Sequence, residues 1–182
     1  MTIGVTMNGN MLPAAPLKRR FAALCYELLL IGAVSCAAFI PAGVLALFLN
    51  QSAPQLSSLL VTLVILYAWW LYFKINWHKK GQTLAMQVWR IGLCDRTGVR
   101  PPLNLLWLRF IWACVFLVFV PMLAYAALNR GMGVPPKTAG GAALIWWILP
   151  WGFALLNADR QFLYDYLAGT RLVDVKKQDK AV

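Results

Sequence analysis

FAALCYELLLIGAVSCAAFIPAGVLALFL, residues 21–49, carries one charged side chain, Glu27, among otherwise uncharged residues. A membrane-spanning helix needs roughly 20 mainly apolar residues, so this run is long enough to cross a bilayer. A carboxylate inside such a segment is costly to hold in lipid. The run therefore predicts a transmembrane helix in which Glu27 has a polar partner.

Three further apolar stretches follow, and together with the first they predict an all-α membrane protein. The chain is 61% hydrophobic and only 13% charged, a composition too apolar for an ordinary soluble domain. The expected spans are about residues 21–49, 57–75, 103–128 and 139–157. We expect a four-span helical bundle, with residues 18–173 as one domain between a poorly ordered N-terminal tail (1–17) and a C-terminal tail (174–182).

The positive charges indicate how the bundle is oriented. The net charge of +11 would suggest nucleic acid in a soluble protein. If the N-terminus is cytoplasmic, however, the external loops hold only Arg130 and Lys137 of the 17 basic residues. The positive-inside rule then places both termini in the cytoplasm. The expected partner of the inner charges is an anionic lipid leaflet and not nucleic acid.

The interval between the second and third spans predicts a short helix, a strand, or one running into the other. Thr83 is suited to cap a helix that lies on the membrane surface. Arg90–Cys94 alternatively reads as a strand that ends in a turn. Near the C-terminus, Gly169 is suited to end a helix, and Arg171–Val175 resembles a second strand. The two strands could pair as a small cytoplasmic element.

Glu27 allows two interpretations from the sequence. Its neighbours three and four residues away are all apolar, so its partner must be water, a tyrosine or a cation from another element. In the structural interpretation it joins a buried ionic network with Arg20, Arg109 or Arg160. In the functional one it is a cation or proton site reached from the cytoplasm. We expect Arg109 itself to extend its guanidinium to the lipid headgroups.

Other kinds of chemistry have little sequence support. The four cysteines show no metal-ligand spacing, and the chain has one histidine, so we expect no metal site and no cofactor. No nucleophile and base are paired by motif, so we expect no enzymatic activity. Asp165, in an amphipathic segment after the fourth span, is a second candidate acidic residue.

Three segments in order resemble the RDD family of bacterial membrane proteins, which is named for one arginine and two aspartates. They are RRFAALCYE (19–27), GQTLAM (81–86) and RQFLYDYLAGTRLV (160–173). The resemblance implies that Glu27 stands for the first aspartate and Asp165 for the second. Tyr164 and Tyr166 stand where histidine and a basic residue are common, and Gly92 stands where arginine is frequent, so the charge cluster is thinner here.

The resemblance implies a bacterial inner-membrane protein and suggests a transport-related role, including cation/proton exchange. The expected cytoplasmic-side cluster consists of Arg20, Glu27 and Asp165. Its supporting residues are Arg109, Arg160, Gln82 and Tyr164. Four spans make a thin pathway, so we expect a homo-oligomer or a membrane protein partner. The alternative is a non-catalytic accessory or assembly subunit of a larger membrane complex.

Overall fold

The computed structural model describes residues 6–7, 10–157 and 160–175, and within them the chain is an all-α membrane bundle. In this part of the chain four helical stretches are long and apolar enough to cross a membrane. They are Leu17–Leu49, Pro54–Lys80, Leu103–Gly131 and Pro136–Leu156. The predicted four-span bundle is confirmed.

The first two spans, α1 (Leu17–Leu49) and α2 (Pro54–Lys80), form an antiparallel hairpin with extensive mutual contact. Pro54 begins α2, where a proline loses no helical hydrogen bond. The Trp69 indole N–H of α2 donates to Ser35 Oγ of α1 at 2.8 Å. Such a bond between helices fixes their register in an environment that offers no competing water.

The third span changes its helical geometry where proline interrupts it. It runs through α4 (Leu103–Cys114), the π-helical η1 (Val115–Phe119), α5 (Val120–Ala126) and the π-helical η2 (Ala127–Gly131). Pro121 has no N–H to donate to the carbonyl of Leu117, four residues earlier. The Trp147 indole N–H of the fourth span donates to that carbonyl at 3.0 Å. The proline therefore creates a contact between the last two spans.

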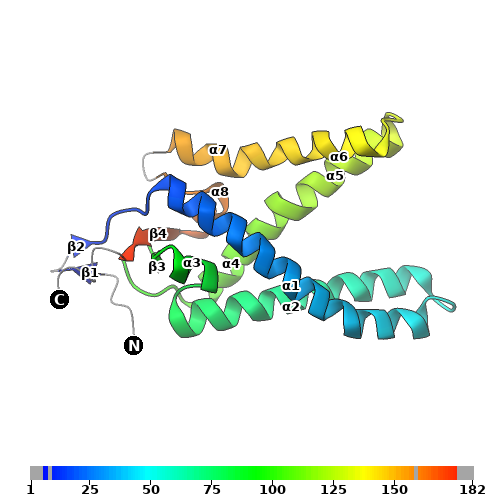
Figure 1. The fold of residues 1–182 in the computed structure, drawn as a ribbon, viewed down its shortest axis with the longest axis horizontal. Helices are drawn as coiled ribbons and strands as arrows, with labels where there is room; N and C mark the ends of the chain where they lie inside the picture. The colour runs from blue at the N-terminus through cyan, green and yellow to red at the C-terminus, as the bar shows by residue number, and fades with distance from the viewer. Residues whose placement is uncertain (1–5, 8–9, 158–159, 176–182) are drawn as a thin grey trace.

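The fourth span consists of α6 (Pro136–Leu144), the 3-10 turn η3 (Ile145–Trp147) and α7 (Ile148–Leu156). Figure 1 shows that the α1–α2 hairpin and the α5–α6 hairpin diverge away from the end of the molecule that carries β3 and β4. We call that end the sheet end. The helices of the two hairpins come together there, and this convergence positions the polar residues described below.

The sheet end contains the predicted small element. β3 (Ile91–Asp95) pairs antiparallel with β4 (Thr170–Asp174). Each strand follows a short helix, α3 (Leu84–Val88) before β3 and α8 (Leu163–Ala168) before β4. The helix-then-strand prediction and the strand pairing are confirmed. So are both predicted caps, since the Thr83 hydroxyl accepts from the Met86 N–H at 3.2 Å and Gly169 ends α8 with φ +69°.

The N-terminal segment adds to this sheet. β1 (Thr6–Met7) and β2 (Asn10–Met11) pair with each other, and Ala14 then forms a bridge with Val173 of β4. The Ala15 N–H donates to the Leu172 carbonyl at 3.0 Å. The sequence predicts a poorly ordered tail here, whereas Leu12 and Ala15 are buried. The remainder of the two predicted tails, residues 1–5, 8–9 and 176–182, lies outside the described residues.

Aromatic side chains join α2 to α4 next to the sheet end. The Trp70 and Trp107 rings stack with centroids 3.9 Å apart, and the Phe73 and Phe110 rings lie with centroids 6.0 Å apart. Farther along the spans large apolar side chains point outward, and Leu47 is 78% exposed. This distribution fits a bundle that is packed at the sheet end and surrounded by lipid elsewhere.

Gly169 tests the role of the α8 cap. We expect Gly169→Ala to destabilise the protein by about 1–2 kcal/mol, because alanine is strained at positive φ. Gly32→Ala is the matched control, since a Cβ there would meet nothing within 4 Å. Thermal unfolding in detergent, followed by tryptophan fluorescence, should show a Tm lowered by about 2–4 °C per kcal/mol for Gly169→Ala alone. An equal Tm for both variants would contradict the assignment.

Candidate functional site

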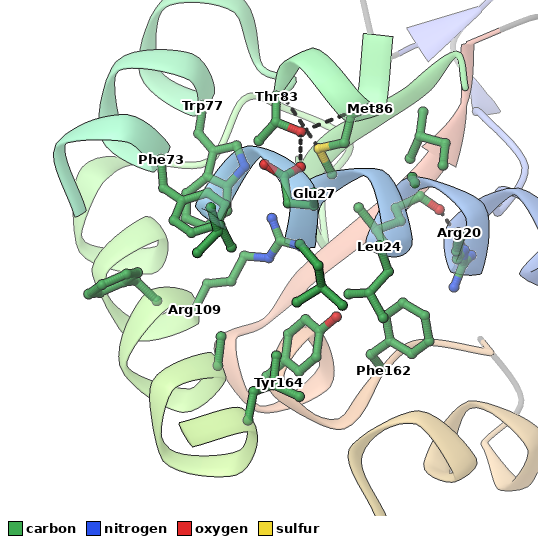
Figure 2. A pocket seen from close by; sticks show the side chains of 18 residues that line it. Arg20, Leu24, Glu27, Phe73, Trp77, Thr83, Met86, Arg109, Phe162 and Tyr164 are labelled. Carbon is green, nitrogen blue, oxygen red and sulfur yellow. Dashed lines mark hydrogen bonds between the residues drawn. The ribbon is translucent and has the colours of Figure 1, made fainter. Parts of the chain in front are cut away.

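The candidate site is a partly open cavity of about 100 Å³ at the sheet end. Figure 2 shows its side chains converging from α1, α2, α4 and the segment around α8. Most of the lining is apolar and includes Leu24, Leu28, Phe73, Phe110, Ala113 and Phe162. The polar lining residues are Arg20, Glu27, Thr83, Arg109 and Tyr164. A few polar groups on apolar walls are typical of small-molecule sites.

Glu27 is held on the wall of this cavity by two hydroxyl groups from different elements. The Tyr72 hydroxyl of α2 donates to Oε1 at 2.6 Å. The Thr83 hydroxyl donates to Oε2, while its oxygen accepts from the Met86 N–H and so caps α3. Among the described residues no Lys, Arg or His forms an ion pair with Glu27. The sequence-based expectation that a tyrosine could be its partner is therefore met by Tyr72.

Asp165 is fully buried and is paired with Arg109 of the third span. The Arg109 Nε donates to Asp165 Oδ1 at 2.6 Å, and the Thr170 hydroxyl lies 3.3 Å from the same oxygen. The Arg109 guanidinium also lies over the Trp77 ring at 4.6 Å. The expectation that Arg109 reaches the lipid headgroups is wrong, because its side chain is 7% exposed. A buried carboxylate offers it a stronger partner than the headgroups.

Arg20 is almost fully buried at the start of α1, where it connects three segments. Its Nη2 donates to the Leu172 carbonyl of β4 at 3.1 Å, and its Nη1 donates to the Arg160 carbonyl. Arg160 adopts φ +50°, in the left-handed region that is unusual for a residue with a side chain. Its side chain is exposed, so Arg160 contributes a backbone oxygen and not the predicted guanidinium.

Two supporting residues differ in their relation to the cavity. The Gln82 amide donates to the Ile91 carbonyl of β3 at 2.8 Å; Ile91 lines the cavity, whereas Gln82 itself does not. Tyr164 lines the cavity and is 5% exposed. Burial, followed by the charge of Asp165, raises the pKa of Tyr164 well above its usual value. Its hydroxyl is therefore a neutral donor.

The predicted cluster is thus brought together only in part. Arg20 and Glu27 line the same cavity, whereas Asp165 lies behind its wall and acts through Arg109. Tyr72 and Trp77 are site residues that the sequence patterns do not indicate, and the same holds for Thr83 as a partner of Glu27. The sequence indicates only that Glu27 needs a polar partner from another element. The packing of α1 against α2 and α3 shows that the partners are the hydroxyls of Tyr72 and Thr83.

Three buried donors at the cavity have no hydrogen-bond acceptor among the described residues. They are Arg20 Nε, Trp77 Nε1 and Arg109 Nη1. Buried N–H groups are nearly always paired in proteins, so these three are unusual, and all three belong to residues that line the cavity. In the same part of the chain, no three His, Cys, Asp or Glu side chains gather as metal ligands. The lining therefore favours a ligand that accepts hydrogen bonds.

The family model described as the RDD family matches residues 14–169 of the chain. This range holds all the polar residues of the cavity wall and the Arg109–Asp165 pair. No match was found among curated proteins or among solved structures.

The buried ion pair yields a stability prediction. Arg109→Gln leaves the Asp165 carboxylate buried without a counter-charge, which should destabilise the fold by about 3–5 kcal/mol. Adding Asp165→Asn should recover part of this loss, because it removes the unpaired charge. Unfolding in mixed micelles by titration with a denaturing detergent measures both variants.

The matched control is Arg19→Gln, which breaks the less buried pair of Arg19 with Asp174. Partly exposed pairs contribute about 0–1 kcal/mol, so we expect a smaller loss. A double variant no more stable than Arg109→Gln alone would contradict the role of the pair.

Proposed function

We propose that this chain, which belongs to the RDD family, is a small transport-related membrane protein that carries a proton, or a cation in exchange for a proton, at Glu27. One observation supports this most directly. Of the two carboxylates at or directly behind the cavity wall, Asp165 is paired with Arg109, whereas Glu27 lines the cavity and its hydrogen-bond partners are hydroxyls. Glu27 is therefore the carboxylate that can exchange a proton.

The two hydroxyl partners suit a group that changes its protonation state. A hydroxyl can donate to a carboxylate or accept from a carboxylic acid by rotating its hydrogen. Thr83 and Tyr72 can therefore satisfy Glu27 in both forms without moving their heavy atoms. A guanidinium partner would instead hold Glu27 permanently ionised.

The mainly apolar walls favour a proton over a hydrated metal cation at this site. Metal cations such as Mg²⁺ and Ca²⁺ need about six or more oxygen ligands, and the cavity offers few. A proton needs one acceptor and a path of polar groups. The site therefore binds and transfers a proton, and no enzymatic chemistry is proposed for it.

The surroundings follow from the charge distribution and the number of spans. We propose that the protein lies in a bacterial inner membrane with both termini cytoplasmic, so that the cavity is near the inner leaflet. Four spans enclose little space, so the functional unit is a homo-oligomer or a complex with another membrane protein.

An accessory role is the second candidate. Figure 1 shows that the two helical hairpins diverge, so a long face of each hairpin does not contact the other hairpin. These faces favour the accessory role. A stoichiometric membrane partner that co-purifies with the chain, together with no flux from the chain alone, would favour this role over transport.

The transport proposal predicts flux that depends on Glu27. In proteoliposomes holding a pH-sensitive dye, the wild-type protein should dissipate an imposed pH gradient. The gradient is imposed either without added cation or with Na⁺ or K⁺ on the side opposite to the higher proton concentration. Glu27→Gln should reduce the rate to that of protein-free liposomes, because the amide cannot exchange a proton. Glu27→Asp should retain part of the rate.

Ser35→Ala is the matched control for this experiment. It also removes a hydrogen bond between α1 and α2, but Ser35 does not line the cavity. We expect Ser35→Ala to dissipate the pH gradient at the wild-type rate. Absence of flux in wild type under all ion conditions would overturn the proposal.

Orientation is predicted independently. Green fluorescent protein fused after Val182 should be fluorescent, because it folds in the cytoplasm. Alkaline phosphatase inserted after Gly133, in the loop between the third and fourth spans, should be active outside. The opposite pattern would contradict the positive-inside assignment.

A further inference from the structure

We infer that the cavity binds a small amphiphile with a carboxylate head and an apolar chain, such as a medium-chain fatty acid, and that a proton on Glu27 favours its binding. The inference rests on the proposed function only in placing the exchangeable proton on Glu27. The evidence for the ligand is separate and comes from the donors, the walls and the size of the cavity.

The buried donors favour a ligand whose head is anionic or strongly accepts hydrogen bonds. Arg20 Nε, Trp77 Nε1 and Arg109 Nη1 belong to side chains that line the cavity, and all three are buried without an acceptor in the described part of the chain. Their residues are 1%, 3% and 6% exposed. Both oxygens of Glu27 already accept hydroxyl hydrogens. Asp165 Oδ2 is a buried acceptor without a partner among the described residues, but Asp165 does not line the cavity. A bound molecule with an accepting head would supply acceptors on the cavity side.

The apolar walls of the cavity favour a ligand that carries an apolar chain on the same molecule as its head. Leu24, Phe73, Phe110 and Ala113 surround the space next to the donors. Leu28, also on the wall, is 42% exposed, so the cavity opens past it toward the lipid. A chain can leave by this opening while the head stays beside Arg109 and Trp77, which lie next to each other in Figure 2. An inorganic anion would leave the apolar walls uncovered.

The size of the cavity suits a carboxylate head with part of its chain. A site for one water molecule needs about 10–15 Å³ of volume measured in the same way, so about 100 Å³ holds a carboxylate and several carbons of a chain. Arginine N–H groups match the planar carboxylate well.

The charges connect this ligand to Glu27. Besides the Thr83 hydroxyl, the ionisable groups next to Glu27 are Tyr72 of α2, Arg109 of α4 and Tyr164 of α8. Arg20 of α1 lines the same cavity, and Asp165 of α8 pairs with Arg109 behind its wall. Two arginines and Asp165 give one net positive charge, which an ionised Glu27 cancels. When Glu27 is protonated the site keeps its positive charge and attracts an anion. Carboxylate binding and proton uptake by Glu27 are therefore coupled.

The test is calorimetric titration of octanoate into the full chain in lipid nanodiscs, with empty nanodiscs subtracted. We expect saturable binding, and titrations in two buffers of different ionisation enthalpy should show proton uptake. Glu27→Gln should still bind octanoate but without proton uptake. Trp77→Phe removes one donor and should weaken binding by at least about threefold, whereas the control Trp69→Phe, whose indole donates to Ser35, should leave it unchanged.

Ala113→Phe places a ring in the cavity without altering any charge, and it should abolish octanoate binding in a folded protein. Octyltrimethylammonium, with the same chain and the opposite charge, should not bind. The inference is overturned if octanoate does not saturate, if the cation binds as well, if octyl phosphate binds at least tenfold more tightly, or if Ala113→Phe has no effect. Glu27-dependent flux without octanoate binding would overturn the assignment of the ligand but would not contradict the proposed function.

Discussion

The buried pair of Arg109 and Asp165 is the interaction on which the sheet end depends. It joins the third span to α8, and α8 leads through Gly169 directly into β4. β4 in turn accepts the Arg20 guanidinium through the Leu172 carbonyl. Because an uncompensated buried charge is costly, both partners must stay in place. The pair therefore fixes the elements that surround the cavity, although Asp165 itself does not line it.

This arrangement separates the two carboxylates by role. Asp165 has a cationic partner, Arg109, and the pair joins α8 to the third span. Glu27 has hydroxyl partners, which tolerate either protonation state, and it lies on the wall of the cavity. Two acidic residues that look equivalent in the sequence thus have environments that suit one for structure and the other for exchange.

Much of the fold could be predicted because it depends on local patterns. Apolar length gave the four spans, Thr83 and Gly169 marked helix ends, and β-type segments gave the paired strands. The candidate site could be predicted only in part. Arg20 and Glu27 were singled out from the sequence and line one cavity, but Arg109 was expected at the lipid headgroups and Arg160 as a charged partner. Whether a long cationic side chain turns inward depends on a buried acceptor from a distant segment, which no local pattern reveals.

The sequence by itself determined that the chain spans a membrane four times and that Glu27 needs a polar partner, because hydrophobic length and the cost of burying charge are properties of short segments. The tertiary structure alone decided that this partner is a pair of hydroxyls from Tyr72 and Thr83. It also decided that Arg109 pairs with Asp165 instead of Glu27, and that three buried donors without an acceptor in the described part of the chain belong to residues lining one cavity. These outcomes depend on the packing of segments far apart in the chain, where small differences in distance determine which charges meet.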